Sequence, residues 1–534
     1  MPVPIDEGQL ARIVEDVVRK MRPEPAAGVG ASTGSLTTAS RESGTTPTTE
    51  PPPSGRGAAG HGPPRAEARG SDVVPDLRDA VLRTPTADPE SGIFTTVDEA
   101  VQAAREAYGE FSVLSLERRK GFIEAMRRAA IDSAERLGRD AVAETGLGRV
   151  PHKVQKILLA AIKTPGVEDL EPKVFTGDNG LTLIEPAPWG VVGSITPTTN
   201  PAETVINNAL SAVSAGNAVV FHPHPSAKGV SNFAVRTLNR AIHAAGGPRT
   251  LLCSIASPTL ETSAALMQHP GIRILVVTGG GEVVRLAMRS GKKCIAAGPG
   301  NPPVIVDDTA DLAKAARSIV DGASFDNNVL CTAEKEVLVF ENVADRLVSE
   351  MQGCGALLVG GAALERLLAQ VVVPGEPFPH PHGDYPHPNK AFVGKDASVL
   401  LAAAGLQASR DVRLLVAEVP FEHPLVQGEM LMPLLPIVRV KDLDDALAKA
   451  LVAEHGYRHS AVMHSESVSR LTRVAREIET TIFTKNAPSY AGLGYGGEGY
   501  CTLSIAGPTG EGLTSARSFT RQRRCVLVGG FRIL

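Results

Sequence analysis

Short hydrophobic runs alternate with longer segments of helical periodicity through the middle of the chain. The runs that predict β-strands are residues 191–195, 218–221, 274–277, 303–306 and 337–340. The segments that predict helices include residues 97–109, 115–145, 205–215 and 227–245. Strands that alternate with helices of this length are typical of parallel sheets, so the pattern predicts an α/β fold.

The N-terminal region has a different pattern. Residues 4–22 repeat hydrophobic side chains at helical spacing, with charged residues on the other face, and this stripe ends at Pro23. The spacing predicts an amphipathic helix. Residues 23–91 are rich in Pro, Gly, Ser, Thr and Ala, which predicts a disordered linker because little apolar surface could be buried. The helix is either a docking peptide or an element that folds back onto the main body.

Composition and charge narrow the function classes. The chain has 534 residues and a hydrophobic fraction of 43%, which is ordinary for a globular protein with more than one domain. Its formal net charge of −4 does not show the excess of positive charge that is typical of nucleic-acid-binding proteins. No stretch approaches the roughly 20 apolar residues of a membrane span, and the N-terminus lacks the pattern of a secretory signal. We therefore expect neither a nucleic-acid partner nor a membrane partner.

The cysteines are scattered along the chain. They show neither the CxxC or CxxH spacing of a zinc site nor the pattern of a disulfide framework. The six are Cys253, Cys294, Cys331, Cys354, Cys501 and Cys525. A cytoplasmic, reduced protein without a metal site is expected, so one of these thiols is available as a nucleophile.

Two glycine-rich segments are candidate phosphate-binding turns. Gly492, Gly494 and Gly497 fit the spacing G-x-G-x-x-G, but no clear strand precedes them and no helix follows, so a loop is expected. Residues 278–281 (Thr-Gly-Gly-Gly) are the better candidate, because they follow a strand-like run and open a helical one. Such a turn exposes backbone N–H groups that suit a cofactor phosphate. Val284 occupies the third glycine position, so this is not the Rossmann signature.

Asn200 and Cys331 each allow two interpretations. Asn200 lies between a hydrophobic strand and a helix that begins near Ala202, where it is either a helix cap or an amide donor at the end of a sheet. A cysteine beside Val329 and Leu330 is more often a buried core residue than a nucleophile. The preceding asparagines favour a loop or a helix start near the edge of a sheet.

Six long segments are distinctive when they are taken together. They are ITPTTNPAETVINNALSAVSAGNAVVFHPHPSAK (195–228), AAGPGNPPVIVDDTADL (296–312), GASFDNNVLCTAEKEV (322–337), GEMLMPLLPIV (428–438), EHGYRHSAVMHS (454–465) and GPTGEGLTSARSFTRQRRCVLV (507–528). They resemble the aldehyde dehydrogenase superfamily, and most closely its CoA-acylating branch in bacterial microcompartments, the propionaldehyde and acetaldehyde dehydrogenases. The resemblance covers residues 92–534 in colinear order.

The resemblance implies roles for individual residues. Cys331 matches the catalytic cysteine, and Asn200 matches the asparagine that supports the oxyanion. The residues that match cofactor-contacting positions are Thr196, Pro197, His222 and Pro223 in the walls of the cleft, Gly279, Gly280, Gly281 and Glu282 in the turn beneath the pyrophosphate, and Glu429 at the nicotinamide ribose. His455, His459 and His464 receive no firm role; surface positions are expected for them, and the alternative for His455 is a position near the site.

One departure from the hydrolytic members of the superfamily bears on the mechanism. Those members carry a glutamate that activates water, whereas the matching segment here is Ala-Ala-Gly-Pro-Gly-Asn (296–301), with Ala297 aligned to the carboxylate. Water has a pKa of about 15.7, whereas a thiol has a pKa of about 8.5. This difference corresponds to roughly 10 kcal/mol in ease of ionisation. A site without a general base therefore favours coenzyme A over water.

The resemblance implies an aldehyde dehydrogenase-like α/β fold. We expect an encapsulation helix (1–22), a linker (23–91), a Rossmann-type cofactor domain (92–295), an α/β catalytic domain (296–484) and a C-terminal segment (485–534) with an extended β oligomerisation arm. The expected reaction oxidises a short-chain aldehyde with NAD as cofactor and coenzyme A as co-substrate. Propionaldehyde is the first choice of substrate, and acetaldehyde is the second.

The implied setting is a homo-oligomer inside a bacterial microcompartment, with a shell protein bound through the N-terminal helix. Two alternatives stay open. A hydrolytic aldehyde dehydrogenase would release the free acid, and a non-catalytic microcompartment scaffold would use only the helix and linker. The absence of the aligned glutamate disfavours the first, and Cys331 and Asn200 disfavour the second.

Overall fold

The computed structural model describes residues 87–373, 387–407 and 412–533. The expected helix at 1–22 and residues 23–86 of the expected linker lie outside this part of the chain. Residues 87–91 are described, and the short 3-10 helix η1 (Pro89–Ser91) already lies just before the expected domain start at Gly92. No helix among the described residues is long and apolar enough to cross a membrane.

The first body is built on a parallel sheet of six strands in the order β1-β6-β5-β4-β7-β8. The strands are β1 (Ile93–Phe94), β4 (Val191–Ile195), β5 (Ala218–His222), β6 (Leu252–Ile255), β7 (Ile274–Thr278) and β8 (Lys293–Ala297). The chain runs outward from β4 through β5 to β6, and then returns to the other side of β4 for β7 and β8. This reversal of strand order is the switch point of a doubly wound sheet, where ligands bind at the carboxyl ends of the strands.

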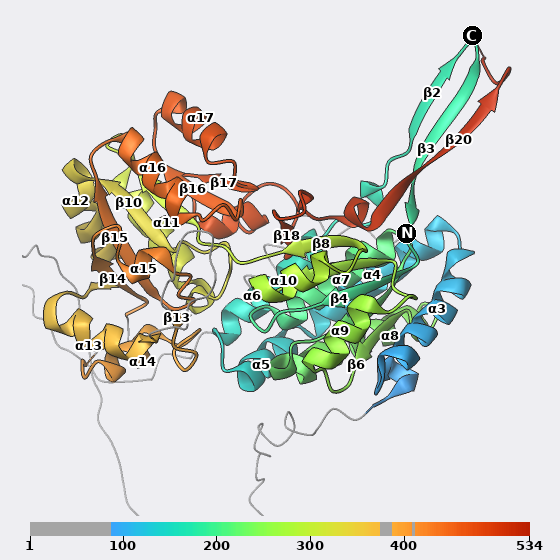
Figure 1. The fold of residues 1–534 in the computed structure, drawn as a ribbon, viewed down its shortest axis with the longest axis horizontal. Helices are drawn as coiled ribbons and strands as arrows, with labels where there is room; N and C mark the ends of the chain where they lie inside the picture. The colour runs from blue at the N-terminus through green and yellow to red at the C-terminus, as the bar shows by residue number, and fades with distance from the viewer. Residues whose placement is uncertain (1–86, 374–386, 408–411, 534) are drawn as a thin grey trace, which may run out of the picture.

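Helices surround this sheet (Figure 1). They are α3 (Val97–Ser112), α4 (Leu116–Asp132), α5 (Ala134–Thr145), α6 (Val150–Lys163), α7 (Pro201–Ser214), α8 (Lys228–Ala244), α9 (Leu260–Gln268) and α10 (Gly281–Met288). The expected helical segment at 115–145 is two helices, because the chain breaks at Ser133. Thr96 begins α3 with a capping box in which its side chain and that of Glu99 each accept the other's backbone N–H.

The second body contains a parallel sheet of seven strands in the order β11-β14-β15-β10-β9-β16-β17. Its strands are β9 (Pro303–Val306), β10 (Glu336–Phe340), β11 (Ala356–Leu358), β14 (Leu414–Glu418), β15 (Leu434–Val440), β16 (Ser460–His464) and β17 (Ile482–Lys485). Its helices are α11 (Leu312–Ser324), α12 (Glu341–Gly353), α13 (Gly361–Val371), α14 (Ala397–Ala403), α15 (Pro424–Gln427), α16 (Leu443–Ala453) and α17 (Val468–Glu477). The first sheet ends at Ala297, so its last strand crosses the expected boundary between 295 and 296.

An arm of three antiparallel strands projects from the first body (Figure 1). The hairpin of β2 (Lys173–Gly177) and β3 (Gly180–Pro188) pairs with β20 (Thr520–Val528) from the C-terminal segment. The sequence predicted an extended tail, but the hairpin that completes the arm comes from residues 173–188, inside the expected cofactor domain. The remaining short strands are β12 (Val372–Val373), β13 (His387–Pro388), β18 (Ile505–Ala506) and β19 (Gly512–Leu513).

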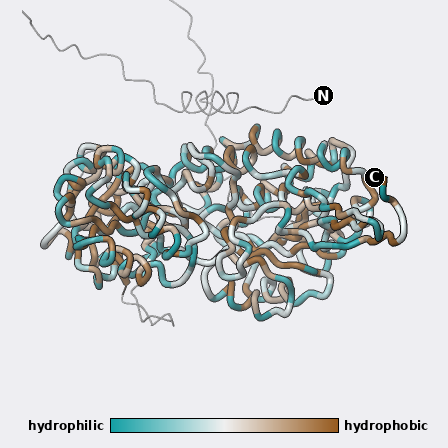
Figure 2. The backbone as a smooth tube through the Cα atoms, turned by 90° about the horizontal axis from the view of Figure 1, so that it is seen from above, coloured by the Kyte–Doolittle hydropathy of each residue, from teal (hydrophilic) through white to brown (hydrophobic). Residues whose placement is uncertain are grey.

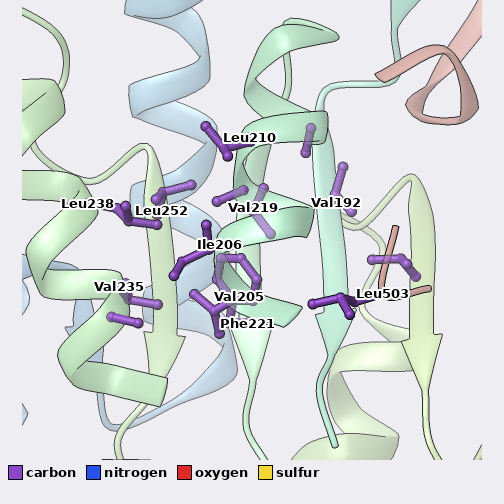
Figure 3. Packing of buried hydrophobic residues seen from close by; sticks show 14 of the residues in the cluster. Val192, Val205, Ile206, Leu210, Val219, Phe221, Val235, Leu238, Leu252 and Leu503 are labelled. Carbon is purple, nitrogen blue, oxygen red and sulfur yellow. The ribbon is translucent and has the colours of Figure 1, made fainter. Parts of the chain in front are cut away.

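The five predicted strand runs and the alternation of helices and strands are confirmed. In Figure 2 the two bodies lie side by side, and many hydrophobic stretches run through their interiors. Figure 3 shows the packing of the first core, where Phe221 and Val219 of β5 lie among side chains of α7 such as Ile206. Leu503 joins this cluster from the C-terminal segment, so that segment packs against the first body.

Candidate active site

Cys331 follows a turn with unusual backbone geometry. Asp326, Asn327 and Asn328 have φ angles of 49°, 54° and 65°, all in the left-handed region. Asp and Asn tolerate this region better than other non-glycine residues, but each such residue still costs on the order of 1–3 kcal/mol. The turn therefore needs strong support from its surroundings, and it places Cys331 at the end of the loop ahead of β10.

Buried polar side chains provide that support. The Asn328 amide donates to the carbonyl oxygens of Ala323 at 2.9 Å and Glu334 at 3.0 Å. The Lys335 ammonium donates to the carbonyl oxygens of Asn328 at 2.9 Å and Leu330 at 3.1 Å. The residues around the nucleophile thus hold a conformation that the backbone alone would not favour.

Asn200 is the N-cap residue of α7, but its side chain makes no capping hydrogen bond. Its Oδ1 accepts a hydrogen bond from Lys156 Nζ at 2.5 Å, and its Nδ2 donates to Thr199 Oγ1 at 3.2 Å. An amide nitrogen carries two hydrogens, so one remains for another acceptor. Asn200 therefore occupies the N-cap position that the sequence suggested, but its side chain does not cap the helix.

Four buried charges lie between Asn200 and the Cys331 turn. Asp326 contacts Lys153 Nζ at 2.9 Å and Lys156 Nζ at 2.5 Å, and Glu203 lies 3.4 Å from Lys156 Nζ. We call these four residues the charge cluster. They carry two positive and two negative charges, and all four side chains are at most 3% exposed. Sequence reasoning missed them, although two lysines on the hydrophobic face of α6 were a visible signal.

The charge cluster brings the two expected catalytic residues to one place. Lys156 bonds Asn200, and its charge also acts on the Cys331 thiol to lower its pKa. Burial and, after it, the nearby Glu429 carboxylate nevertheless raise the pKa of Cys331 to about 12 against the opposing charge of Lys335. The thiol is therefore protonated in this structure at neutral pH, and it needs a base before it can act as a nucleophile.

Glu429 brings a carboxyl group to the nucleophile. It lies 3.8 Å from Lys335 Nζ, and burial raises its pKa to about 7 despite Lys335 and a hydrogen bond from the Gly300 backbone. Residues 296–301 supply no acid, as the sequence shows. Glu429 nonetheless places a carboxyl group near Cys331, and it reaches the site from the loop after α15.

The three histidines of residues 454–465 are buried, so the expected surface positions are wrong. His459 is the one next to the nucleophile: a Cβ added to Gly300 would lie 2.9 Å from the His459 ring and 2.8 Å from the Cys331 carbonyl oxygen. Its Nδ1 pairs with Ser460 Oγ at 2.5 Å, and burial together with Lys335 lowers its pKa to about 3. His459 is therefore a neutral residue of the site that sequence reasoning left without a role.

The expected cofactor walls lie at the carboxyl ends of β4 and β5. Thr196 and Pro197 follow β4, while His222 ends β5 and Pro223 follows it. The Thr196 backbone N–H donates to the His222 carbonyl oxygen at 3.2 Å, and His222 Nε2 pairs with Thr262 Oγ1 at 2.8 Å. Burial lowers the pKa of His222 to about 4, so this wall is uncharged at neutral pH.

The glycine turn follows β7, on the other side of β4. Gly280 is the N-cap of α10 and makes no side-chain capping bond, and no atom lies within 4 Å of a Cβ placed on Gly279 or Gly280. Glu282 is exposed and pairs with Arg285. An uncapped helix start with open space above two glycines fits a phosphate group. Gly492 lies in the short 3-10 helix η5 (Ser489–Leu493), whereas Gly494 and Gly497 follow it in the predicted loop.

The candidate site thus joins both bodies. The first body contributes Asn200, the walls after β4 and β5 and the glycine turn, and the second contributes Cys331, Glu429 and His459. Among residues 87–373, 387–407 and 412–533, no group of three His, Cys, Asp or Glu side chains is placed to hold a metal ion.

Comparisons with known proteins identify the family of the chain. Residues 71–366 match the Aldehyde dehydrogenase family. The chain is 50% identical over 446 residues, 83% of this chain and 94% of the relative, to the acetaldehyde dehydrogenase (acetylating) EutE of Salmonella typhimurium. It is 47% identical to the Rhodopseudomonas palustris propionaldehyde dehydrogenase with bound propionyl-CoA, with a TM-score of 0.79 over 82% of this chain and 96% of that one.

A second structure of the Rhodopseudomonas enzyme contains CoA and an acylated cysteine; its TM-score is 0.79, at 47% identity over 82% of this chain and 98% of that one. The propionaldehyde dehydrogenase from the Clostridium phytofermentans fucose utilisation bacterial microcompartment is 46% identical, with a TM-score of 0.80 over 83% of this chain and all of that one. The family match, the sequence identities and the shared fold agree, and the chain belongs to the aldehyde dehydrogenase family.

Proposed function

We propose that this protein is an NAD-dependent, CoA-acylating aldehyde dehydrogenase that oxidises a short-chain aldehyde through a thioester on Cys331. The observation that carries the proposal is that Lys156 bonds both Asn200, after β4 at the switch point of the first sheet, and Asp326 of the turn that precedes Cys331. The relatives that act on acetaldehyde and propionaldehyde support a small aldehyde. Propionaldehyde is the first choice of substrate and acetaldehyde the second.

The first step is removal of the thiol proton from Cys331. Glu429 is suited to take it, because its pKa of about 7 leaves a large part of the carboxyl groups ionised at neutral pH. The thiolate then attacks the aldehyde carbonyl, and a C–S bond forms as the carbonyl oxygen gains negative charge. The free Nδ2–H of Asn200 donates to that oxygen, and one such donor is worth about 2.7–4 kcal/mol.

The cofactor fits the first body. The N-terminus of α10 and residues Gly279 to Gly281 would hold the pyrophosphate, with Glu282 beside them, and residues Thr196, Pro197, His222 and Pro223 would line the cleft. When bound, the nicotinamide supplies the acceptor for the hydride that leaves the thiohemiacetal carbon. The contact of Glu429 with the nicotinamide ribose stays a prediction.

Coenzyme A is the acceptor that the site favours. Residues 296–301 contain no acidic residue, whereas hydrolytic members of the superfamily carry there the glutamate that activates water. A thiol acceptor ionises far more easily than water, so it needs less help from a base. The acylated cysteine and bound CoA of the Rhodopseudomonas relative support this acceptor.

The decisive experiment is an assay of propionaldehyde and NAD with and without CoA, with NADH followed by absorbance and products followed by mass. We expect sustained NADH formation only with CoA, and propionyl-CoA in equal amount. Equal rates without CoA, with free propionate as product, would establish the hydrolytic enzyme instead. The Cys331→Ala variant serves as the control and is expected to form neither product.

We further propose that the enzyme works as a homo-oligomer inside a bacterial microcompartment, with residues 1–22 binding a shell protein. The support is the amphipathic pattern of residues 4–22, the linker composition and the microcompartment origin of the Clostridium relative. Deletion of residues 1–22 should abolish co-purification with shells and leave aldehyde oxidation intact. Loss of activity in that variant would mean that the segment packs on the catalytic body instead.

A further inference from the structure

We propose that Lys156 is a positioning residue that fixes the Asn200 amide for the oxyanion, and that Asp326 ties this pair to the Cys331 turn. The inference rests on the role proposed above for Asn200. Lys156 comes from α6, far from both residues in sequence, and its side chain is 3% exposed. Neither the family resemblance nor the sequence pattern assigned it a role.

The chemistry of the contact sets the orientation of the amide. An ammonium group can only donate hydrogen bonds, so the atom of Asn200 that faces Lys156 must be the oxygen. The contact of 2.5 Å therefore turns Nδ2 away from Lys156. Without the ammonium, the amide could rotate and present its oxygen to the reacting carbonyl, where it would repel the developing negative charge.

Asp326 connects this orientation to the nucleophile. Its carboxylate accepts from Lys156 at 2.5 Å and from the Arg149 backbone N–H at 2.8 Å, and its own backbone N–H donates to His152 Nδ1 at 2.7 Å. The His152 ring also stacks on Phe325, with the centroids 4.6 Å apart. One end of α6 is thus fastened to the turn that precedes Cys331, while Lys156 holds Asn200.

The charge cluster decides which variants are informative. Burial alone would lower the pKa of Lys156, but Asp326 and Glu203 outweigh it and raise the pKa, so the ammonium stays charged. Lys156→Met alone would leave Glu203 and Asp326 with only Lys153 as a partner, which is costly for buried charges. Lys156→Met combined with Glu203→Gln leaves one positive and one negative charge, and this balanced pair of changes keeps the test independent of unfolding.

The test is a double-mutant cycle on acyl-enzyme formation, measured as the single-turnover rate of NADH formation at saturating aldehyde. Asn200→Ala should lower this rate by about 100- to 1,000-fold, the usual effect of losing an oxyanion donor. Lys156→Met should lower it at least 10-fold relative to the Glu203→Gln enzyme. Added to Asn200→Ala in that background, Lys156→Met should lower the rate several-fold less than it does beside an intact Asn200, because the part of its effect that passes through the amide is lost.

A control separates positioning from loss of stability. Glu144 of α5 accepts the backbone N–H groups of Gly229 and Val230 at the start of α8. Glu144→Ala should lower the melting temperature, and any effect on the rate should multiply with that of Asn200→Ala. A purely structural role for Lys156 would give the same multiplicative behaviour, and that result would overturn the inference while the proposed function stands. If Asn200→Ala leaves the rate unchanged, the role of Asn200 fails as well.

Discussion

The ammonium of Lys335 donates to both oxygens of Asn328, to the backbone carbonyl at 2.9 Å and to the side-chain Oδ1 at 2.7 Å. Asn328 is the last left-handed residue of the turn before Cys331. Lys335 therefore stabilises the turn, and it also lowers the pKa of the Cys331 thiol. One buried cation links the geometry of the nucleophile to its ionisation.

Lys335→Met should weaken both the turn before Cys331 and the ionisation of the Cys331 thiol. Loss of hydrogen bonds from a charged donor costs roughly 1.5–3 kcal/mol each, so the melting temperature should fall. The pKa of Cys331 should rise, so its alkylation by iodoacetamide should need a higher pH. The measurement is the pH dependence of alkylation at the Cys331 peptide by mass spectrometry. Faster alkylation at every pH in a folded variant would contradict the account.

Glu429→Gln should shift the same measurement in the opposite direction. The Glu429 carboxylate raises the pKa of Cys331, so its removal should lower that pKa and move the alkylation profile to lower pH. Turnover should nevertheless fall, since the variant lacks the group proposed to take the thiol proton. An alkylation profile that moves to higher pH would show that Glu429 does not act on the thiol in this way.

Two neighbouring glycines offer a matched pair of variants. A Cβ on Gly300 would lie 2.8 Å from the Cys331 carbonyl oxygen and 2.9 Å from the His459 ring, whereas one on Gly298 would meet only Pro508 at 3.6 Å. Gly300→Ala must therefore displace the nucleophile or His459, and we expect kcat to fall at least 10-fold. Gly298→Ala should retain most of the activity. Steady-state assays compare the two, and equal kcat values would contradict the close approach.

The arm should hold subunits together. It exposes hydrophobic residues on a narrow antiparallel sheet, including Phe175, Val526 and Val528, which are 58%, 55% and 78% exposed. Exposed apolar groups of this kind mark contact surfaces. A chain that ends at Phe519 should therefore have a smaller assembly mass than the full chain by light scattering. An unchanged mass would place the subunit contacts elsewhere.

Local pattern predicted the frame of the fold well. The runs at 191–195 and 303–306 became strands with those bounds, because hydrophobic runs of this length fit strands buried on both faces of a sheet. The break at Ser133 was missed, since Ala, Leu and Arg on both sides have the same helical preference. The pairing of residues 180–188 with β20 was also missed, because pairing between distant strands leaves no local signal.

The candidate site also has one part that the sequence predicted and one part that it could not predict. Cys331 and Asn200 could be named from their motifs, but the contacts that control them could not. Lys156 acts from a helix that precedes Asn200 by more than one element, and Glu429 reaches Cys331 from a loop after α15. Tertiary contacts of this kind depend on how the two bodies meet. The buried lysines of α6 were the strongest missed signal, because a charge on a hydrophobic face requires a buried partner.

The most direct test of the central claim is to trap the acyl group on the enzyme. Wild type, mixed with propionaldehyde and NAD without CoA, should gain one propionyl group, mapped to Cys331 by peptide mass spectrometry. Added CoA should then remove that group and yield an equal amount of propionyl-CoA. An acyl group on another residue would contradict the account. Loss of the acyl group as free propionate, at the same rate with and without CoA, would also contradict it.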